Sequence, residues 1–238
     1  MATSYRPRYA QNPRYEQLRR EFVALCIERG GLRPTDRVLD VGCGVGGVAE
    51  VLADHLTTGT YVGLDVDAQA IEQCRAAIRR PGFDFAVIDV RSKKYNPTGA
   101  VTPADYRFPF RDGSIDFVVL RSVFTHMLPD AIENYLRETA RVLRPGGHAA
   151  ITYFLLTDAS RTFLATDQGA ALFPFDHGHY RLRRDAVPEN AVAVDEGWVR
   201  DLYARCGLDV TAVHYGGWAG RPGSSDQDTI IGEKPVAT

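Results

Sequence analysis

Short apolar runs alternate with amphipathic stretches over the first 90 residues of the chain. The apolar runs have the length of buried strands and lie at 37–41, 61–65 and 83–88. The amphipathic stretches carry apolar residues at helical spacing and lie at about 13–29, 48–55 and 67–78. Because each crossover helix must cover one face of the sheet, this alternation predicts βαβ units and a parallel sheet.

The same rhythm continues in the second half of the chain, with two interruptions. Further strands are predicted at 115–120, 148–154, 208–215 and 229–231, and further helices at 130–143 and 195–206. The interruptions, at 91–109 and 157–190, have no sustained period. We predict that residues 1–35 form an arm and a helix. Residues 36–238 are expected to form one α/β domain that carries the two interruptions as substrate-side insertions.

A glycine-rich turn follows the first predicted strand. Gly42, Gly44, Gly46 and Gly47 lie directly before a predicted helix. Glycines in this place let a ligand approach the backbone, and the first N–H groups of the helix are available to bind it. Asp65, at the end of the second strand, is placed to bind a ribose diol. The sequence therefore predicts a nucleoside-binding site at this turn.

The turn is also compatible with a dinucleotide cofactor. Gly42, Gly44 and Gly47 satisfy the pattern G-x-G-x-x-G, with an acidic residue about 20 positions further on. Asp40, however, lies two residues before the first glycine, where a carboxylate would repel a pyrophosphate and attract an ammonium group. Asp89, after the third strand, can accept a hydrogen bond from an adenine amino group. The chain also has no Tyr-x-x-x-Lys pair for hydride transfer, so we favour a cofactor other than a nicotinamide dinucleotide.

The motifs between 38 and 154, taken in order, resemble those of class I methyltransferases, which use S-adenosylmethionine. The matching pieces are V-L-D-V-G-C-G-V-G at 38–46, G-L-D at 63–65, I-D at 88–89, F-P-F-R-D-G-S-I-D-F-V at 108–118 and R-V-L-R-P-G-G at 141–147. The resemblance covers about half of the chain. It implies a Rossmann-like, doubly wound, mostly parallel seven-stranded sheet with an antiparallel last strand. The chain departs from the family's pattern between Asp89 and Phe108, where the family generally has only a few residues.

The resemblance also assigns residues to S-adenosylmethionine. It implies cofactor contacts from the glycine turn and from the ends of the next two strands, at Gly42, Gly44, Gly46, Asp65, Val66, Asp89 and Val90. Asp40 would lie toward the methionine moiety. Arg121, just past the fourth strand, would lie near the sulfonium.

A histidine is the expected proton acceptor for methyl transfer to a hydroxyl, because its ordinary pKa lies near neutrality. His126 follows the fourth strand, and ligands of doubly wound sheets bind beyond the carboxyl ends of the strands. We predict His126 as the catalytic base and His214, past another strand end, as the second candidate. His177 and His179 form an H-x-H pair that could hold a metal, but two ligands at that spacing are common by chance, and we expect no metal site.

Aromatic and polar residues gather in the irregular segments. They are Tyr95, Asn96, Tyr106, Phe173, Phe175, Tyr180, Tyr215 and Trp218. Flat rings beside polar groups suit a sugar or a glycosylated acceptor, although each ring taken singly is equally compatible with ordinary loop core. The expected acceptor is therefore a small molecule with a hydroxyl group.

The overall composition narrows the class of protein. The formal net charge is −2, which gives no general electrostatic reason to bind nucleic acid. No apolar stretch reaches the roughly 20 residues of a membrane span, and the first residues lack the apolar region of a secretory signal. The four cysteines form no CxxC pair, which fits reduced thiols. We expect a soluble cytoplasmic protein without a membrane or nucleic-acid partner, for which a homodimer is an allowed assembly.

These observations favour methylation of an oxygen atom on a small molecule. Methylation of nitrogen or carbon stays open, since a fold does not fix the acceptor. A non-catalytic protein that binds S-adenosylmethionine and serves as a partner subunit is a further alternative from a different class.

Overall fold

The computed structural model describes residues 14–93, 95–222 and 225–236. The proposed N-terminal arm and the start of the helix expected at about 13–29 lie outside these residues. Within the described ranges, every helix is too short or too polar to cross a lipid bilayer.

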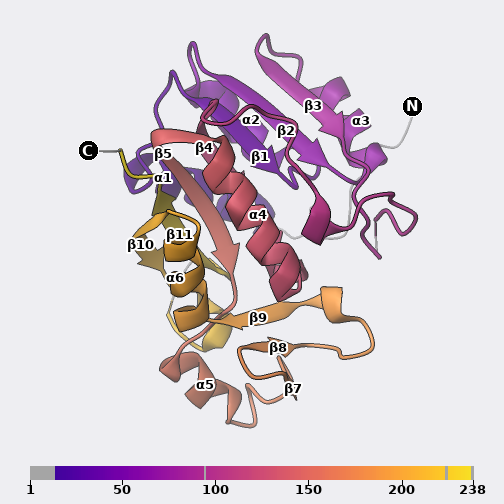
Figure 1. Ribbon diagram of the computed structural model, residues 1–238, viewed down its shortest axis with the longest axis vertical. Helices are drawn as coiled ribbons and strands as arrows, with labels where there is room; N and C mark the ends of the chain where they lie inside the picture. Colours follow the sequence, from indigo (N-terminus) through magenta and orange to yellow (C-terminus); the bar gives the residue numbers. More distant parts are fainter. Residues whose placement is uncertain (1–13, 94, 223–224, 237–238) are drawn as a thin grey trace.

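A seven-stranded sheet forms the centre of the molecule (Figure 1). Its strands are β1 (Arg37–Val41), β2 (Thr60–Asp65), β3 (Phe83–Val87), β4 (Ile115–Leu120), β5 (Leu143–Tyr153), β10 (Asp209–His214) and β11 (Asp228–Glu233). The order is β10-β11-β5-β4-β1-β2-β3, and β11 runs antiparallel to both of its neighbours. The expected Rossmann-like, mostly parallel sheet with an antiparallel last strand is confirmed.

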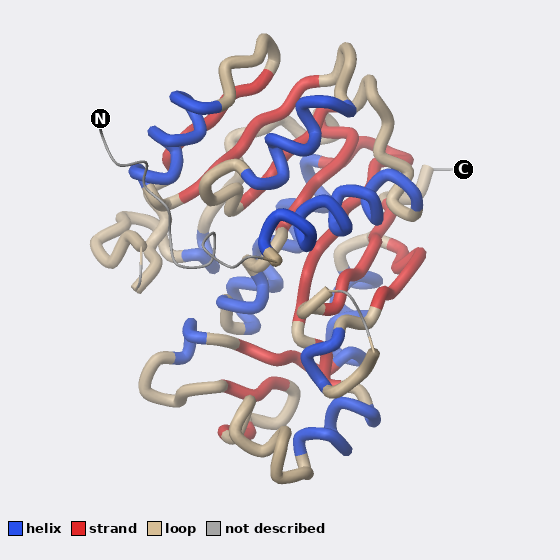
Figure 2. Tube along the Cα trace, turned by 180° about the vertical axis from the view of Figure 1, so that it is seen from behind, coloured by secondary structure: helices blue, strands red, loops and turns tan. Residues whose placement is uncertain are grey.

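Helices cover both faces of this sheet (Figures 1 and 2). One face carries α1 (Tyr15–Glu28), α2 (Gly47–His55) and α3 (Ala68–Ala77), and the other carries α4 (Pro129–Val142) and α6 (Glu196–Arg205). Successive residues of a strand point to opposite faces. Val38 therefore packs with the first group of helices, whereas Leu39 packs with the second.

The strand order reverses between β1 and β4. β1 pairs with β2 on one side and with β4 on the other, and all three strands run in parallel. In doubly wound sheets, the crevice at the carboxyl ends of such strands is where ligands bind. The loops after β1, β2, β3 and β4 therefore build the candidate site.

A second, smaller sheet lies beyond the carboxyl ends of β4 and β5 (Figure 1). Its strands are β6 (Leu155–Leu156), β9 (Val192–Asp195), β8 (Tyr180–Leu182) and β7 (Phe175–Asp176), and α5 (Asp158–Leu164) packs beside it. We call this sheet with α5 the lobe, residues 155–195. The prediction of an irregular 157–190 was wrong, because strands of two or three residues leave no period in the sequence and need distant partners to form.

Several local predictions can be compared with the observed ends of helices and strands. The Asp67 side chain caps α3, accepting from the N–H groups of Gln69 and Ala70, and Asp195 caps α6. The helix predicted at 130–143 begins one residue earlier, because Pro129 suits the first turn of a helix. The proposed division at residue 35 stays a prediction.

Candidate active site

The glycine turn connects β1 to α2 in a backbone conformation that requires glycine. Gly42 has φ +79° and Gly46 has φ +80°, both in the left-handed region. A Cβ on Gly42 would lie 2.5 Å from Cγ2 of Val123, in the loop after β4. The turn is thus packed against the loop that follows β4, and a side chain here would force the two apart.

Asp65, at the end of β2, holds this turn in place. Its carboxylate accepts the backbone N–H of Gly44 at 2.7 Å and that of Asp67 at 2.9 Å. Burial raises its pKa above the ordinary value, while these two hydrogen bonds oppose the rise. Each carboxylate oxygen has two lone pairs, so the same group retains capacity to bind a ribose hydroxyl.

Asp40 lies beneath the turn and not at its surface. Its side chain is 1% exposed and accepts the hydroxyl of Tyr61, a fully buried residue of β2. Burial raises the pKa of Asp40 to about 7. The Asp40 carboxyl is therefore not exposed to a ligand in this structure. Its predicted contact with the methionine moiety stays a prediction.

Arg121 is directed toward α1. Its guanidinium lies 5.8 Å from the ring centre of Tyr15 and 5.6 Å from that of Phe22. Burial lowers its pKa, whereas Tyr15 and Asp40 nearby favour its charged form. The structure places Arg121 with Asp40 under the N-terminal helix, and its predicted place near the sulfonium stays a prediction.

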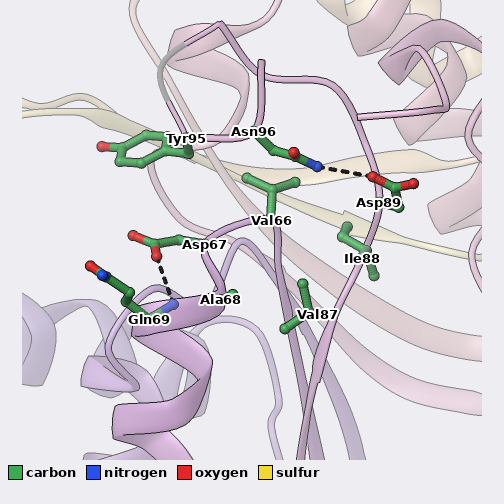
Figure 3. A pocket seen from close by; sticks show the side chains of 9 residues that line it. All are labelled: Val66, Asp67, Ala68, Gln69, Val87, Ile88, Asp89, Tyr95 and Asn96. Carbon is green, nitrogen blue, oxygen red and sulfur yellow. Dashed lines mark hydrogen bonds between the residues drawn. The ribbon is translucent and has the colours of Figure 1, made fainter. Parts of the chain in front are cut away.

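A cavity of about 620 Å³ opens at the carboxyl ends of β2 and β3 (Figure 3). It is lined by Val66, Asp67, Ala68, Gln69, Val87, Ile88, Asp89, Tyr95 and Asn96. The Asn96 amide donates to Asp89 at 3.1 Å and to the backbone oxygen of Val90 at 3.2 Å, and the side chain of Val90 is buried. The loop 91–101 therefore supplies one wall of this cavity.

The sequence identified part of this wall and missed part of it. The sequence predicts Val66 and Asp89 at the cofactor and marks Tyr95 and Asn96 only as aromatic and polar loop residues. Asp67, Ala68 and Gln69 were not expected, although a helix start directly after Asp65 was a usable sign. Because α3 begins at Ala68, three residues after Asp65, a cofactor bound to Asp65 would lie beside the first turn of α3.

His126 lies in the short helix η3 (Phe124–His126) after β4, and its side chain is exposed. Its Nδ1 lies 3.0 Å from the backbone oxygen of Glu189. A carbonyl oxygen only accepts, so Nδ1 carries the proton and the lone pair of the neutral ring lies on Nε2. The lobe thus fixes the tautomer in which Nε2 can accept a proton.

The backbone just before His126 is strained. Ser122 has φ +60°, the one non-glycine residue with positive φ among those described. Its N–H donates to the hydroxyl of Thr152 at 2.7 Å, and its own hydroxyl donates to Gln227 at 3.0 Å. These bonds hold the loop after β4 in a conformation that costs on the order of 1–3 kcal/mol, as is common at ligand sites.

His214 is distant from this arrangement. It ends β10, which is three strands away from β4 in the sheet order, a separation of about 14 Å. Its Nε2 is buried without a hydrogen-bond partner, and burial lowers the pKa of the ring. The structure therefore does not bring His214 and His126 together.

His177 contacts other residues of the lobe, whereas His179 packs against α6. His177 stacks on Tyr180 with ring centres 4.9 Å apart and lies 2.9 Å from a carboxylate oxygen of Asp185. The His179 ring packs against Trp198. Among residues 14–93, 95–222 and 225–236, no three His, Cys, Asp or Glu side chains are grouped as a metal ion would need.

The remaining aromatic candidates have differing roles. Phe173 is buried in the core of the lobe, with its ring centre 5.5 Å from that of Trp218 and 5.3 Å from that of Phe154. Phe175 and Tyr215 are exposed. For Phe173 and Trp218 the loop-core interpretation applies, which weakens the argument from aromatic residues for a sugar acceptor.

Comparison with known proteins agrees with this geometry. Residues 39–151 match the family model described as a methyltransferase domain. The chain is 38% identical over 123 residues to a fatty-acid O-methyltransferase of Mycolicibacterium smegmatis, covering 52% of this chain and 37% of that protein. It is 38% identical over 126 residues to a phthiotriol/phenolphthiotriol dimycocerosates methyltransferase of Mycobacterium tuberculosis, covering 53% and 39%. The matched part is thus less than two fifths of the length of these curated relatives.

A solved structure extends the likeness to most of the chain. A SAM-dependent methyltransferase of Methanosarcina mazei superposes with a TM-score of 0.62 at 20% identity, covering 89% of this chain and 98% of that one. At this identity the likeness concerns the fold. This likeness of fold and the family match over residues 39–151 agree with the resemblance of the chain to class I, S-adenosylmethionine-dependent methyltransferases.

Proposed function

We propose that this protein is an S-adenosylmethionine-dependent methyltransferase that methylates an oxygen atom of a small molecule. The observation that carries the proposal is the cavity at the carboxyl ends of β2 and β3. Asp89 lines this cavity, and Asp65, which precedes the lining residue Val66, also binds the backbone of Gly44 in the glycine turn. These carboxylates can accept hydrogen bonds from ribose hydroxyls and an adenine amino group. The residues present therefore fit the adenosine moiety of S-adenosylmethionine. When bound, this cofactor would supply an activated methyl group.

His126 is the proposed base. The acceptor hydroxyl would attack the methyl carbon as the carbon–sulfur bond breaks, and its proton would pass to Nε2 of His126. The backbone oxygen of Glu189 would stabilise the imidazolium through the bond to Nδ1. The protein's other contribution is alignment, because holding the hydroxyl in line with the methyl group removes most of the entropic cost.

The acceptor is proposed as either a glycoside or a lipid. A sugar was favoured by the polar and aromatic loops. The relative named as a fatty-acid O-methyltransferase favours an apolar acceptor with an oxygen nucleophile. Both are small molecules whose oxygen atom can be activated or oriented by the same histidine.

Titration calorimetry with S-adenosylmethionine, S-adenosylhomocysteine and NAD tests the cofactor. We expect S-adenosylmethionine and S-adenosylhomocysteine to bind and NAD not to bind. A panel of glycosides and fatty acids, followed by mass spectrometry for a gain of one methyl group, tests the acceptor. Tight binding of NAD without any response to the methionine compounds would contradict the proposal, and cofactor binding without turnover on any acceptor would favour a non-catalytic partner subunit.

A further inference from the structure

Glu189 lies between two parts of the site that are far apart in the sequence. It belongs to the short helix η4 (Pro188–Asn190) of the lobe and is half-buried. Its backbone oxygen lies 3.0 Å from Nδ1 of His126, and its carboxylate accepts the backbone N–H of Lys93 at 3.0 Å. One residue thus contacts both the proposed base and the loop that walls the cavity.

The described part of the loop that Glu189 holds, residues 91–93 and 95–101, is closed by its own hydrogen bonds. Arg91 and Val101 are joined by a backbone bond of 2.8 Å, and the backbones of Ser92 and Asn96 are joined by two bonds of 2.9 and 3.0 Å. Lys93 lies inside this small turn. Because the turn is closed by its own hydrogen bonds, holding Lys93 also fixes Asn96 and, with it, the wall of the cavity (Figure 3).

We propose that Glu189 is a positioning residue that couples the cofactor cavity to the base, an inference that rests on the proposed function. Its carboxylate keeps the loop 91–101 against the cavity, and its backbone oxygen keeps the ring of His126 in the tautomer with the lone pair on Nε2. A ligand in the cavity that contacts Tyr95 and Asn96 stabilises the loop, the loop stabilises η4, and η4 orients His126.

Two substitutions of Glu189 distinguish the loss of its hydrogen-bond acceptor from the loss of its negative charge. In Glu189→Ala the Lys93 N–H loses its acceptor, and we expect S-adenosylhomocysteine to bind about 3- to 10-fold more weakly, the effect of one hydrogen bond near the surface. We expect kcat to fall by a similar factor, with the KM for the acceptor nearly unchanged. Glu189→Gln keeps an oxygen that can accept from Lys93 and is expected to restore most of both values.

Asp185→Ala is the matched control. Asp185 is an exposed acid of the same lobe, and its carboxylate lies 2.9 Å from Nε2 of His177. We expect it to leave both cofactor binding and kcat as in the unsubstituted protein. An equal loss in Asp185→Ala and Glu189→Ala would mean that the lobe is merely destabilised, and it would overturn the proposal.

A double-mutant cycle with His126→Ala tests the coupling itself. If Glu189 acts on the reaction through His126, Glu189→Ala lowers kcat no further in the His126→Ala background, yet it still weakens S-adenosylhomocysteine binding. Full additivity in kcat would overturn the coupling. The coupling would also be overturned if the Glu189→Ala protein matched the unsubstituted protein in both its affinity for S-adenosylhomocysteine and its kcat.

Hydrogen exchange separates this proposal from the proposed function. Should the unsubstituted protein bind no S-adenosylhomocysteine, the proposed function fails, but the contact between lobe and loop can still be measured. Amides of 91–101 should then exchange faster in Glu189→Ala than in Asp185→Ala. Equal rates in the two variants would show that Glu189 does not hold the loop.

Discussion

The cofactor side and the lobe side of the site are built in different ways. Around the glycine turn, the bonds that fix the geometry join residues close in the sequence, such as Asp65 to Gly44 and Tyr61 to Asp40, each pair 21 positions apart. On the lobe side, His126 and Glu189 are 63 positions apart, and Glu189 and Lys93 are 96 apart. The first region is set by one βαβ unit, and the second exists only when three distant segments meet.

The difference also appears in how each side is stabilised. The glycine turn is backed by the sheet, where Leu39 and Leu64 are buried in the large core. One face of the lobe's sheet, with Leu182 and Val194, joins the large core. Its other face belongs to a small cluster around Phe173, which packs against Phe154 and Trp218 from outside the lobe. A small core buries less apolar surface and stabilises less. The acceptor side should therefore be the part that opens first.

Truncation of Phe173, a buried ring of the lobe, should produce the largest difference in stability between the lobe and the cofactor side. Phe173→Ala deletes a buried aromatic side chain, which typically costs about 3–5 kcal/mol. We expect amides of the lobe to lose protection in hydrogen exchange, while S-adenosylhomocysteine still binds. Phe175→Ala, at an exposed ring of the same lobe, is the control. Loss of cofactor binding together with the lobe would show that the two regions fold as one.

The buried carboxyl beneath the turn should make stability depend on pH. The pKa of Asp40 is raised to about 7 by burial, from an ordinary 3.8. The folded chain therefore holds this proton more tightly than the unfolded chain. The free energy of unfolding should fall as pH rises from about 4 to about 7, by as much as about 4 kcal/mol.

Asp40→Asn should remove this dependence, because the amide does not ionise and its oxygen can still accept from Tyr61. Urea unfolding at about pH 5 and about pH 8 measures the difference. We expect the variant to gain stability over the unsubstituted protein at the higher pH only. An identical fall in both proteins would mean that Asp40 does not carry this proton.

The base on the lobe side should affect rate and leave cofactor affinity alone. We expect His126→Ala to lower kcat by at least roughly 10²-fold, the contribution typical of a general base. His214→Ala should cost less, since β10 lies at the far edge of the sheet. Loss of activity in the His214 variant with full activity in the His126 variant would reverse this assignment. If both variants stay active, alignment alone must carry the reaction.

The carboxylate at the end of β2 should affect affinity and leave the lobe alone. Asp65→Ala removes the proposed ribose contact and the bond that holds Gly44, and hydrogen bonds to a charged group contribute about 1.5–3 kcal/mol. S-adenosylhomocysteine should therefore bind roughly 10- to 100-fold more weakly. Asp84→Ala, at an exposed acid of β3, is the matched control for calorimetry. An unchanged dissociation constant would place the ribose elsewhere.

Much of the cofactor side could be predicted from the sequence. The spacing of glycines before a helix and the acid at the end of the next strand are local features, and they led to Gly42, Gly44 and Asp65. The alternation of strands and helices is local in the same sense. Asp40 shows the limit of this reasoning, because its position in the motif says nothing about how deeply its side chain is buried.

The sequence alone determined the α/β class, the parallel sheet and the glycine turn, because hydrophobic period and turn chemistry act over a few residues. Only the tertiary structure decided that 157–190 forms strands, that Phe173 is core, and that Glu189 joins His126 to the loop 91–101. Strands of two or three residues and single side-chain hydrogen bonds have no period. They form only after the large sheet has brought distant segments together.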